Sequence, residues 1–176
     1  LRKYRGDVRN ASGVEQLTTT VLIPGSFDPI HNGHVEVVET ASRLFDRVVV
    51  ATVRNPQKGE PLFDLDERQA LIAESFTHLD NVEVTMFSSL VVDLARDVGA
   101  SFIVKGLRAI SDFEVELQMA QMNHQISGVD TLFLPTTSKH SFLASKLIRE
   151  IARFGGNIDG MVPPPVARRL KERYQQ

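Results

Sequence analysis

The stretch TTTVLIPGSFDPIHNGH, residues 18–34, decides the fold expected for this chain. A short β-rich apolar run ends at a Pro-Gly turn, and a run with helical spacing begins near the end of the stretch. Gly25 lets the backbone approach a phosphate closely, Ser26 adds a hydroxyl donor, and His34 lies in the first helical turn. Exposed amides and the helix dipole favour anions at such a place. The stretch therefore predicts an anion-binding loop between a strand and a helix.

The two histidines of this stretch also have an ordinary explanation. Either His31 or His34 alone is more often a polar residue at a helix start than a ligand-binding group. Their combination with a strand, a glycine, a serine and a helix onset favours a functional site. Gly33 keeps the helix entrance free of a side chain, so that a nucleotide can lie against it. Neither a G-x-x-x-x-G-K-[ST] loop nor a G-x-G-x-x-G fingerprint occurs in the chain.

Outward from this stretch, apolar runs of strand length alternate with runs of helical spacing. Strands are expected at about 18–23, 47–53, 82–87, 101–104 and 131–134. Helices are expected at about 33–45, onward from a capping box at Asp64 and Glu67, and at about 90–98, 112–126, 142–154 and 166–174. The run Val48 to Ala51 is apolar on both faces, as a central parallel strand requires. We predict an α/β fold with an open, doubly wound, parallel five-stranded sheet and C-terminal helices.

Composition limits the classes of function. The chain has 176 residues, a formal net charge of -2 and no cysteine. No basic field suggests nucleic acid or a membrane surface as a partner, and no apolar run approaches the roughly 20 residues that span a bilayer. The first twenty residues hold no secretory signal, so a cytoplasmic protein is expected. We expect a single domain over 20–176 and an N-terminal arm over 1–19, either flexible or foreign to the domain.

Polar segments follow the expected strands. In an open parallel sheet, ligands bind beyond the carboxyl ends of the strands, near the point where the strand order reverses. Segments 24–29, 54–58, 88–90, 105–108 and 136–141 would meet there, bringing hydroxyls, glycines and several cations to one edge. A phosphate-rich ligand suits that edge. Lys105 and Arg108 flank a glycine directly after an apolar strand, which favours a ligand role over surface decoration.

Several motifs resemble those of one enzyme family. The motifs are Ser26-Phe27-Asp28-Pro29, His31-x-Gly33-His34, Pro61-Leu62-Phe63, Lys105-Gly106-Leu107-Arg108-Ala109, Asp112-Phe113-Glu114-x-Glu116, Met119-Ala120-x-Met122-Asn123 and Ser141-Phe142. The first two resemble the signature of the nucleotidyltransferase superfamily. Together, the motifs resemble the bacterial phosphopantetheine adenylyltransferases, from about residue 21 to the C-terminus.

The resemblance implies a Rossmann-like nucleotidyltransferase fold and a defined reaction. ATP and 4′-phosphopantetheine would yield dephospho-coenzyme A and pyrophosphate, the penultimate step of coenzyme A synthesis. It further implies a Mg²⁺ ion held mainly by the phosphates of ATP, without protein metal ligands, and a homohexamer. Met119 and Met122 would then serve packing or subunit contacts rather than ligand binding.

The resemblance also implies roles for individual residues. The catalytic residues would be His34, Lys58, Ser26 and Arg108. The 4′-phosphopantetheine site would contain Ser26, Lys58, Val91 and Lys105. The ATP site would contain Ser26, Phe27, His34, Gly106, Leu107, Arg108, Glu116, His140, Ser141, Phe142, Leu143, Ala144, Ser145 and Lys146. Taken alone, Lys58 would be a solvated loop charge, Glu116 an ordinary helix carboxylate and Val91 a core residue.

One segment departs from the family pattern. The family usually reads Ser-Phe-Ile-Ser-Ser-Ser before its last long helix, whereas this chain has Ala144 and Lys146 at two of the three final serine positions. Ser145 could still donate to a phosphate, but the point charge of a lysine does not copy a hydroxyl. A changed affinity for ATP is expected.

Two rival functions remain open on the sequence. The first keeps the superfamily but changes the acceptor, as in a nicotinate mononucleotide adenylyltransferase or a cytidylyltransferase. The Lys105 to Arg108 and Asp112 to Glu114 motifs fit the pantetheine enzyme better. The second is a nucleotide-binding regulatory module without turnover, for which the altered serine segment is the only support.

Overall fold

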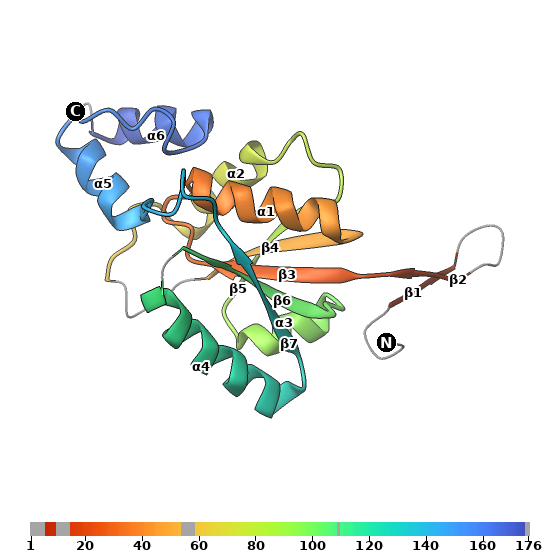
Figure 1. Cartoon of the computed structure of the whole chain (residues 1–176). Coiled ribbons are helices and arrows are strands. Elements are labelled where there is room, and N and C mark those ends of the chain that lie inside the picture. The colour runs from red at the N-terminus through yellow and green to blue at the C-terminus, as the bar shows by residue number, and fades with distance from the viewer. Residues whose placement is uncertain (1–5, 10–14, 54–58, 109, 175–176) are drawn as a thin grey trace.

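The computed structural model describes residues 6–9, 15–53, 59–108 and 110–174. Seven strands and six helices follow one another in these ranges (Figure 1). The strands are β1 (Gly6–Arg9), β2 (Glu15–Thr18), β3 (Thr20–Gly25), β4 (Arg47–Val53), β5 (Val82–Phe87), β6 (Phe102–Leu107) and β7 (Asp130–Pro135). The helices are α1 (Asn32–Leu44), α2 (Leu65–Ser75), α3 (Val91–Asp97), α4 (Ile110–Ser127), α5 (Ser145–Arg153) and α6 (Pro164–Tyr174).

The central sheet has five parallel strands in the order β5-β4-β3-β6-β7. The order runs outward from β3 through β4 to β5, and then reverses through β6 to β7. The reversal point therefore lies between β3 and β6, which is where open α/β sheets bind ligands. The predicted five-stranded, doubly wound parallel sheet is confirmed.

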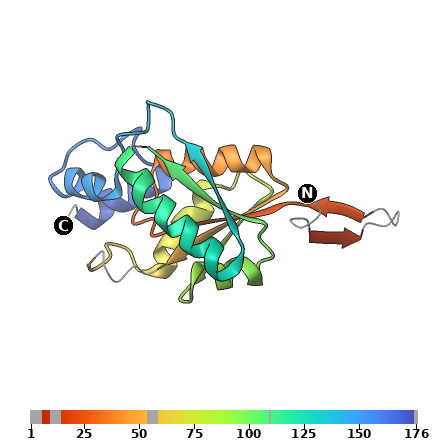
Figure 2. The same cartoon turned by 60° about the horizontal axis from the view of Figure 1, so that its bottom comes forward.

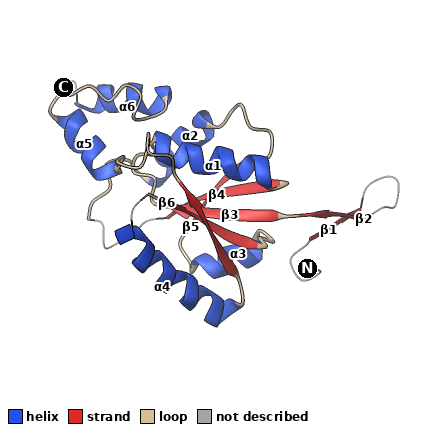
Figure 3. Ribbon diagram, in the orientation of Figure 1, coloured by secondary structure: helices blue, strands red, loops and turns tan. Residues whose placement is uncertain are grey.

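Helices cover both faces of this sheet (Figures 1 and 3). In the orientation of Figure 1, α1 and α2 lie above the sheet and α3 and α4 below it. The strand residues alternate accordingly: Val48 and Val50 join the larger buried cluster with side chains of α1 and α2, whereas Val49 and Ala51 join a second cluster with side chains of α3. Alternation on a strand buried on both faces explains its unbroken apolar run.

The capping box predicted at the start of α2 is confirmed. The Asp64 carboxylate accepts a hydrogen bond of 2.8 Å from the Glu67 amide, and the Glu67 carboxylate accepts one of 3.3 Å from the Asp64 amide. The box satisfies two amides that a helix start would otherwise leave without partners.

Two element boundaries differ from the prediction and affect the site. Strand β6 extends to Leu107 instead of ending near residue 104, because its pairing with β7 continues as far as Leu107 opposite Pro135. Helix α5 begins at Ser145 rather than near Phe142. Ala144 is still extended, with φ -142° and ψ 132°, and the Leu143 amide closes a turn onto the carbonyl of His140 instead.

The N-terminal segment contains a structure that the sequence did not predict. Strands β1 and β2 pair antiparallel, and Figure 2 shows this two-stranded element extending away from the N-terminal end of β3, outside the central sheet. The division between an arm over 1–19 and a domain over 20–176 stays a prediction. In the described part of the chain, no helix has the length and apolar character needed to cross a membrane.

Candidate active site

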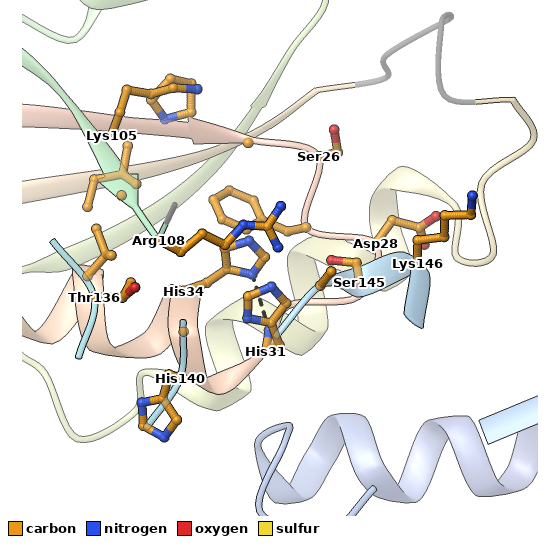
Figure 4. A pocket seen from close by; sticks show the side chains of 18 of the residues that line it. Ser26, Asp28, His31, His34, Lys105, Arg108, Thr136, His140, Ser145 and Lys146 are labelled. Carbon is orange, nitrogen blue, oxygen red and sulfur yellow. Dashed lines mark hydrogen bonds between the residues drawn. The ribbon is translucent and has the colours of Figure 1, made fainter. Parts of the chain in front are cut away.

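A cavity of about 770 Å³ opens at the carboxyl ends of β3 and β6, where the strand order reverses. Its wall combines the β3–α1 loop, the first turn of α1, the end of β6, one face of α4, the β7–α5 loop and the first turns of α5. Figure 4 labels residues from all of these elements except α4. Two helices thus begin at the same cavity. The positive ends of both dipoles favour an anionic ligand there.

The loop after β3 is a tight turn built around Phe27. This residue has a φ of 45°, which is uncommon for any residue with a side chain. Its ring is buried under Gly25, where an added Cβ would come within 2.7 Å of the ring. The ring also meets His34 edge to face, with 5.0 Å between the centroids. Glycine at position 25 is therefore needed to let the phenylalanine pack against the histidine.

The rings of His31 and His34 stack on each other, with 3.6 Å between their centroids (Figure 4). The backbone amide of His31 donates a hydrogen bond of 3.2 Å to Nδ1 of His34. Because Nδ1 of the neutral His34 ring is an acceptor, its proton resides on Nε2. His34 is thereby held as a hydrogen-bond donor in the wall of the cavity. A side chain at Gly33 would press on the His31 ring and on the carbonyl of His140.

His31 is kept neutral by its surroundings. Burial, and then the positive charge of Arg108, lowers its pKa from 6.5 to about 4, while a backbone hydrogen bond acts in the opposite direction. The side chain is 4% exposed. A neutral ring can stack closely on His34 without charge repulsion.

We expect acid to destabilise the fold through His31. The contribution of this residue is fully present above pH 6.5 and is lost as the pH falls toward about 4, because the unfolded chain binds the proton more tightly in that window. The loss amounts to about 3 kcal/mol in the free energy of unfolding. Urea unfolding at pH 7 and pH 4 measures it, and His31→Gln should show a smaller pH dependence than the wild type. An NMR titration of the His31 ring with a midpoint near 6.5 would contradict the assignment.

Three charged side chains stand along β6 and α4. Lys105 and Glu116 form an ion pair of 3.2 Å, and both side chains are 28% exposed at the cavity wall. Arg108 donates a hydrogen bond of 2.6 Å to the carbonyl of Leu143. This bond ties the end of β6 to the β7–α5 loop, with the guanidinium on the same side of the cavity as the two histidine rings (Figure 4).

The β7–α5 loop is fastened to α1 by Glu36. Its carboxylate accepts hydrogen bonds from the amide and hydroxyl of Thr137, at 2.9 and 3.2 Å, and lies 2.8 Å from Nδ1 of His140. Burial raises the pKa of the Glu36 carboxyl, but the hydrogen bonds from His140 and Thr137 outweigh it and hold the pKa below its usual value. This arrangement was not predicted, because nothing in the sequence pairs residues about a hundred positions apart.

Three further residues of the cavity wall have no role that the sequence predicted. They are Asp28, Arg68 and Arg149. Asp28 lies in segment 24–29, which the sequence places at the ligand-binding edge of the sheet, and in a motif quoted for the resemblance. Arg68 is 2% exposed, and its guanidinium donates to the carbonyl of Ser26 at 2.7 Å and of Val53 at 3.2 Å. Burial lowers the pKa of Arg68, and the carboxylates of Asp28 and Asp64 oppose this shift.

The structure gathers most of the predicted site residues in this one cavity. Those in its wall are Ser26, Phe27, His34, Lys105, Gly106, Arg108, Glu116, His140, Ala144, Ser145 and Lys146. The hydroxyl of Ser145 donates a hydrogen bond of 2.9 Å to the carbonyl of Pro29. This bond holds the start of α5 against the β3–α1 loop.

The other predicted residues lie elsewhere. Leu107, Ser141, Phe142 and Leu143 are close in sequence to the cavity residues but are not part of its described wall. Phe142 is 65% exposed, and Leu143 is buried with its carbonyl bound to Arg108. Val91 packs against the second hydrophobic cluster at the start of α3. Lys58 lies outside the described residues.

Metal binding by side chains alone has no candidate in the described ranges. Within them, no three His, Asp or Glu side chains gather in a way that could hold a metal ion, and the sequence has no cysteine. Of the two carboxylates that line the cavity near its cations, Asp28 is bonded to Arg149 and Glu116 to Lys105.

Comparisons with known proteins agree with this geometry. Residues 22–151 match the model of the cytidylyltransferase-like family. Two proteins named phosphopantetheine adenylyltransferase, from Synechococcus sp. strains JA-3-3Ab and JA-2-3B'a(2-13), are each 55% identical over 154 residues, covering 87% of this chain and 96% of theirs.

Two solved structures share the fold. A candidate nicotinate-nucleotide adenylyltransferase from Vibrio parahaemolyticus superposes with a TM-score of 0.64 at 18% identity, covering 88% of this chain and 99% of its own. The lipopolysaccharide core biosynthesis protein from Thermoplasma volcanium GSS1 superposes with a TM-score of 0.52 at 23% identity, covering 68% and 97%. At these identities the likeness concerns the fold alone.

Proposed function

Because this chain belongs to the cytidylyltransferase-like family and, within it, to the phosphopantetheine adenylyltransferases, we propose that it transfers the adenylyl group of ATP to 4′-phosphopantetheine. The products are dephospho-coenzyme A and pyrophosphate, the penultimate step of coenzyme A synthesis. The family resemblance inferred from the sequence motifs is confirmed by the 55% identity over most of the chain.

One observation supports this function above all others. A histidine donor, two helix N-termini and the cations Lys105 and Arg108 line one cavity at the reversal point of the sheet. Such a wall attracts anions from several sides at once. A volume of about 770 Å³ lies within the range of small-molecule sites and has room for two phosphate-bearing substrates that meet at a shared phosphorus.

The chemistry requires positioning more than proton transfer. The phosphate of 4′-phosphopantetheine is already an anion, so it needs no base to become a nucleophile. It must instead approach the α-phosphorus of ATP against the repulsion of like charges. Catalysis then consists of alignment and stabilisation of the charge that develops in the transition state.

His34 and Ser26 are proposed to act at the α-phosphate. The Nε2–H of His34 would donate to an α-phosphate oxygen as negative charge accumulates there, since Nδ1 is held by the amide of His31. Ser26 lies in the β3–α1 loop and also lines the cavity, and the amides at the start of α1 add to the positive potential. Lys58 would bridge nucleophile and α-phosphate; this role comes from the family resemblance.

The two substrates are proposed to occupy opposite parts of the cavity. Lys105, on β6, would bind the phosphate of 4′-phosphopantetheine, while Arg108 and the start of α5 would bind the phosphates of ATP. Lys146 stands in the first turn of α5 and lines the cavity, so its charge would replace the missing hydroxyl of the family's serine segment. Glu116 balances the charge of Lys105 in the protein without ligands.

Mg²⁺ is proposed to enter with ATP, held mainly by the triphosphate. The carboxylates Asp28 and Glu116 at this wall are both engaged by cations, so the donor set fits an ion carried by the nucleotide better than a resident one. When bound, the ion would neutralise charge on the pyrophosphate leaving group. The protein's own cations would orient the triphosphate.

A coupled assay of pyrophosphate release tests the reaction. Purified protein with MgATP should release pyrophosphate with 4′-phosphopantetheine, and not with nicotinate mononucleotide or with no acceptor. The same assay with CTP and a phosphate-bearing alcohol tests the cytidylyltransferase alternative. Tight ATP binding without product from any acceptor would favour the non-catalytic module instead.

The exposed face of α4 supports a homo-oligomer. Met119, Met122 and Ile126 are each more than half exposed on this helix. Apolar side chains gathered on one helix commonly mark an interface. We propose a homohexamer in the cytoplasm, a compartment that the absence of cysteine also fits; sedimentation equilibrium measures the assembly directly.

A further inference from the structure

Asp28 joins three parts of the chain that are far apart in sequence. Its Oδ1 accepts a hydrogen bond of 3.0 Å from the Phe63 amide, and its Oδ2 accepts one of 2.9 Å from the Leu62 amide. The same Oδ2 lies 2.5 Å from Nη1 of Arg149 on α5. The residue is 8% exposed, so these bonds form largely away from water. Each carboxylate oxygen accepts at least one hydrogen bond.

A second cation, more deeply buried than Arg149, completes the cluster. Arg68 reaches across from α2 and holds the carbonyls of Ser26 and Val53, at 2.7 and 3.2 Å. The charge of Asp28 acts on this guanidinium as well as on Arg149. One carboxylate thus acts on two guanidinium groups, and these three side chains together carry one net positive charge. All three side chains lie in the cavity wall (Figure 4 labels Asp28).

The segments held by this cluster are the ones that build the cavity. Asp28 belongs to the loop that carries Ser26 and leads to His34. Leu62 and Phe63 follow Gly59 and Pro61, which line the cavity, and Arg149 belongs to the helix whose first turn brings Ser145 and Lys146. A carboxylate would repel a phosphate, so Asp28 itself is not suited to bind one. Its contacts suit it to hold other groups in place.

Fold stability alone is a weak reason for such a cluster. The Asp28 carboxylate is nearly buried, and desolvation makes such a charge costly even when it is paired; apolar residues of similar volume are often at least as stable. The hydrophobic clusters around the sheet already fasten α2, α5 and α6 to it. The cost is easier to understand where alignment matters, because misplacement of a reacting group by about 1 Å can lower a rate about 10²-fold.

We propose that Asp28 is a positioning residue which, through Arg149 and the amides of Leu62 and Phe63, fixes the relative placement of the β3–α1 loop, the segment before α2 and helix α5 for adenylyl transfer. This proposal rests on the function proposed above. Asp28 does not contact the reacting atoms; it acts through the segments it joins.

The first test is Asp28→Asn. The side chain keeps its size, but one oxygen becomes an NH₂ donor that faces another donor. We expect kcat for pyrophosphate release to fall about 10²-fold, with a smaller change in KM, and amide hydrogen exchange at Leu62 and Phe63 to accelerate at least about tenfold. A kcat within threefold of the wild type in folded protein would overturn the proposal, even with faster exchange, because the contacts would then be structural only.

The second test replaces Arg149. It decides whether the Asp28–Arg149 contact serves catalysis if Asp28→Asn does not fold. Arg149→Met should lower kcat, and Arg149→Lys should recover part of the loss because it keeps a cation near Asp28. Arg153→Met is the matched control: Arg153 is an exposed arginine one turn further along α5, and its loss should leave kcat unchanged. Equal effects of Arg149→Met and Arg153→Met would overturn the proposal.

The proposed reaction and the proposed role of Asp28 can be refuted separately. If the wild type makes no product with 4′-phosphopantetheine, the proposed function is wrong, and the dissociation constant of ATP from calorimetry then decides the role of Asp28. Asp28→Asn should weaken ATP binding about tenfold or more, because α5 is no longer held against the β3–α1 loop. Unchanged ATP affinity together with unchanged exchange at both amides would refute the role.

Discussion

Replacing His34 by alanine is expected to lower the turnover number for pyrophosphate release by about 10²–10³, while the protein stays folded. The imidazole is held at the start of α1 with Nδ1 bonded to the His31 amide, so that its proton is on Nε2, the atom proposed to donate to the α-phosphate. A donor fixed in advance stabilises charge in the transition state without the cost of reorganising at the moment of reaction. Alanine leaves a void there that water cannot fill with the same geometry.

The measurement is kcat at saturating ATP and acceptor, with circular dichroism to verify the fold. His34 also contacts the rings of His31 and Phe27, so a modest loss of stability is expected alongside the loss of rate. His78→Ala serves as control, because His78 is an exposed histidine whose partner is Glu39. If His34→Ala turned over as fast as the wild type, His34 would have no part in the chemistry.

Much of the fold could be predicted because it depends on local patterns. The run Val48 to Ala51 is apolar at every position, and only a strand covered on both faces buries such a run completely. Asp64 and Glu67 stand at capping-box spacing, which depends on four consecutive residues alone. Once the strands were placed, parallel alternation implied that Ser26 and Arg108 would meet at one sheet edge.

What escaped prediction depends on distant contacts. The bond between Asp28 and Arg149 spans 121 positions, and no local pattern marks the two residues as partners. Strand β6 runs on to Leu107 because β7 continues to pair with it, which the composition of β6 does not reveal. The pairing of Lys105 with Glu116 likewise follows from the packing of α4 over β6. Side-chain partners of this kind are decided by tertiary structure rather than by the spacing of residues.

Replacing Lys105 by alanine is expected to raise KM for 4′-phosphopantetheine about 10- to 100-fold, with little change in KM for ATP. A charge-assisted hydrogen bond to a phosphate contributes about 1.5–3 kcal/mol, and each 1.4 kcal/mol is about tenfold in affinity. Alanine also leaves the carboxylate of Glu116 without its cation at 3.2 Å. The bare carboxylate would repel the incoming phosphate and add to the loss. Steady-state kinetics with each substrate varied in turn measures both constants.

The two parts of this loss can be separated with Glu116. In the double variant Lys105→Ala with Glu116→Gln, the repulsion disappears but the missing cation is not replaced, so affinity for 4′-phosphopantetheine should recover in part. Lys171→Ala, on α6 and away from the cavity, controls for the change in net charge. An affinity for 4′-phosphopantetheine that Lys105→Ala leaves unchanged would remove Lys105 from the acceptor site. A double variant no better than the single one would show that Glu116 exerts no repulsion there, and that the entire effect of Lys105 comes from its direct contact with the phosphate.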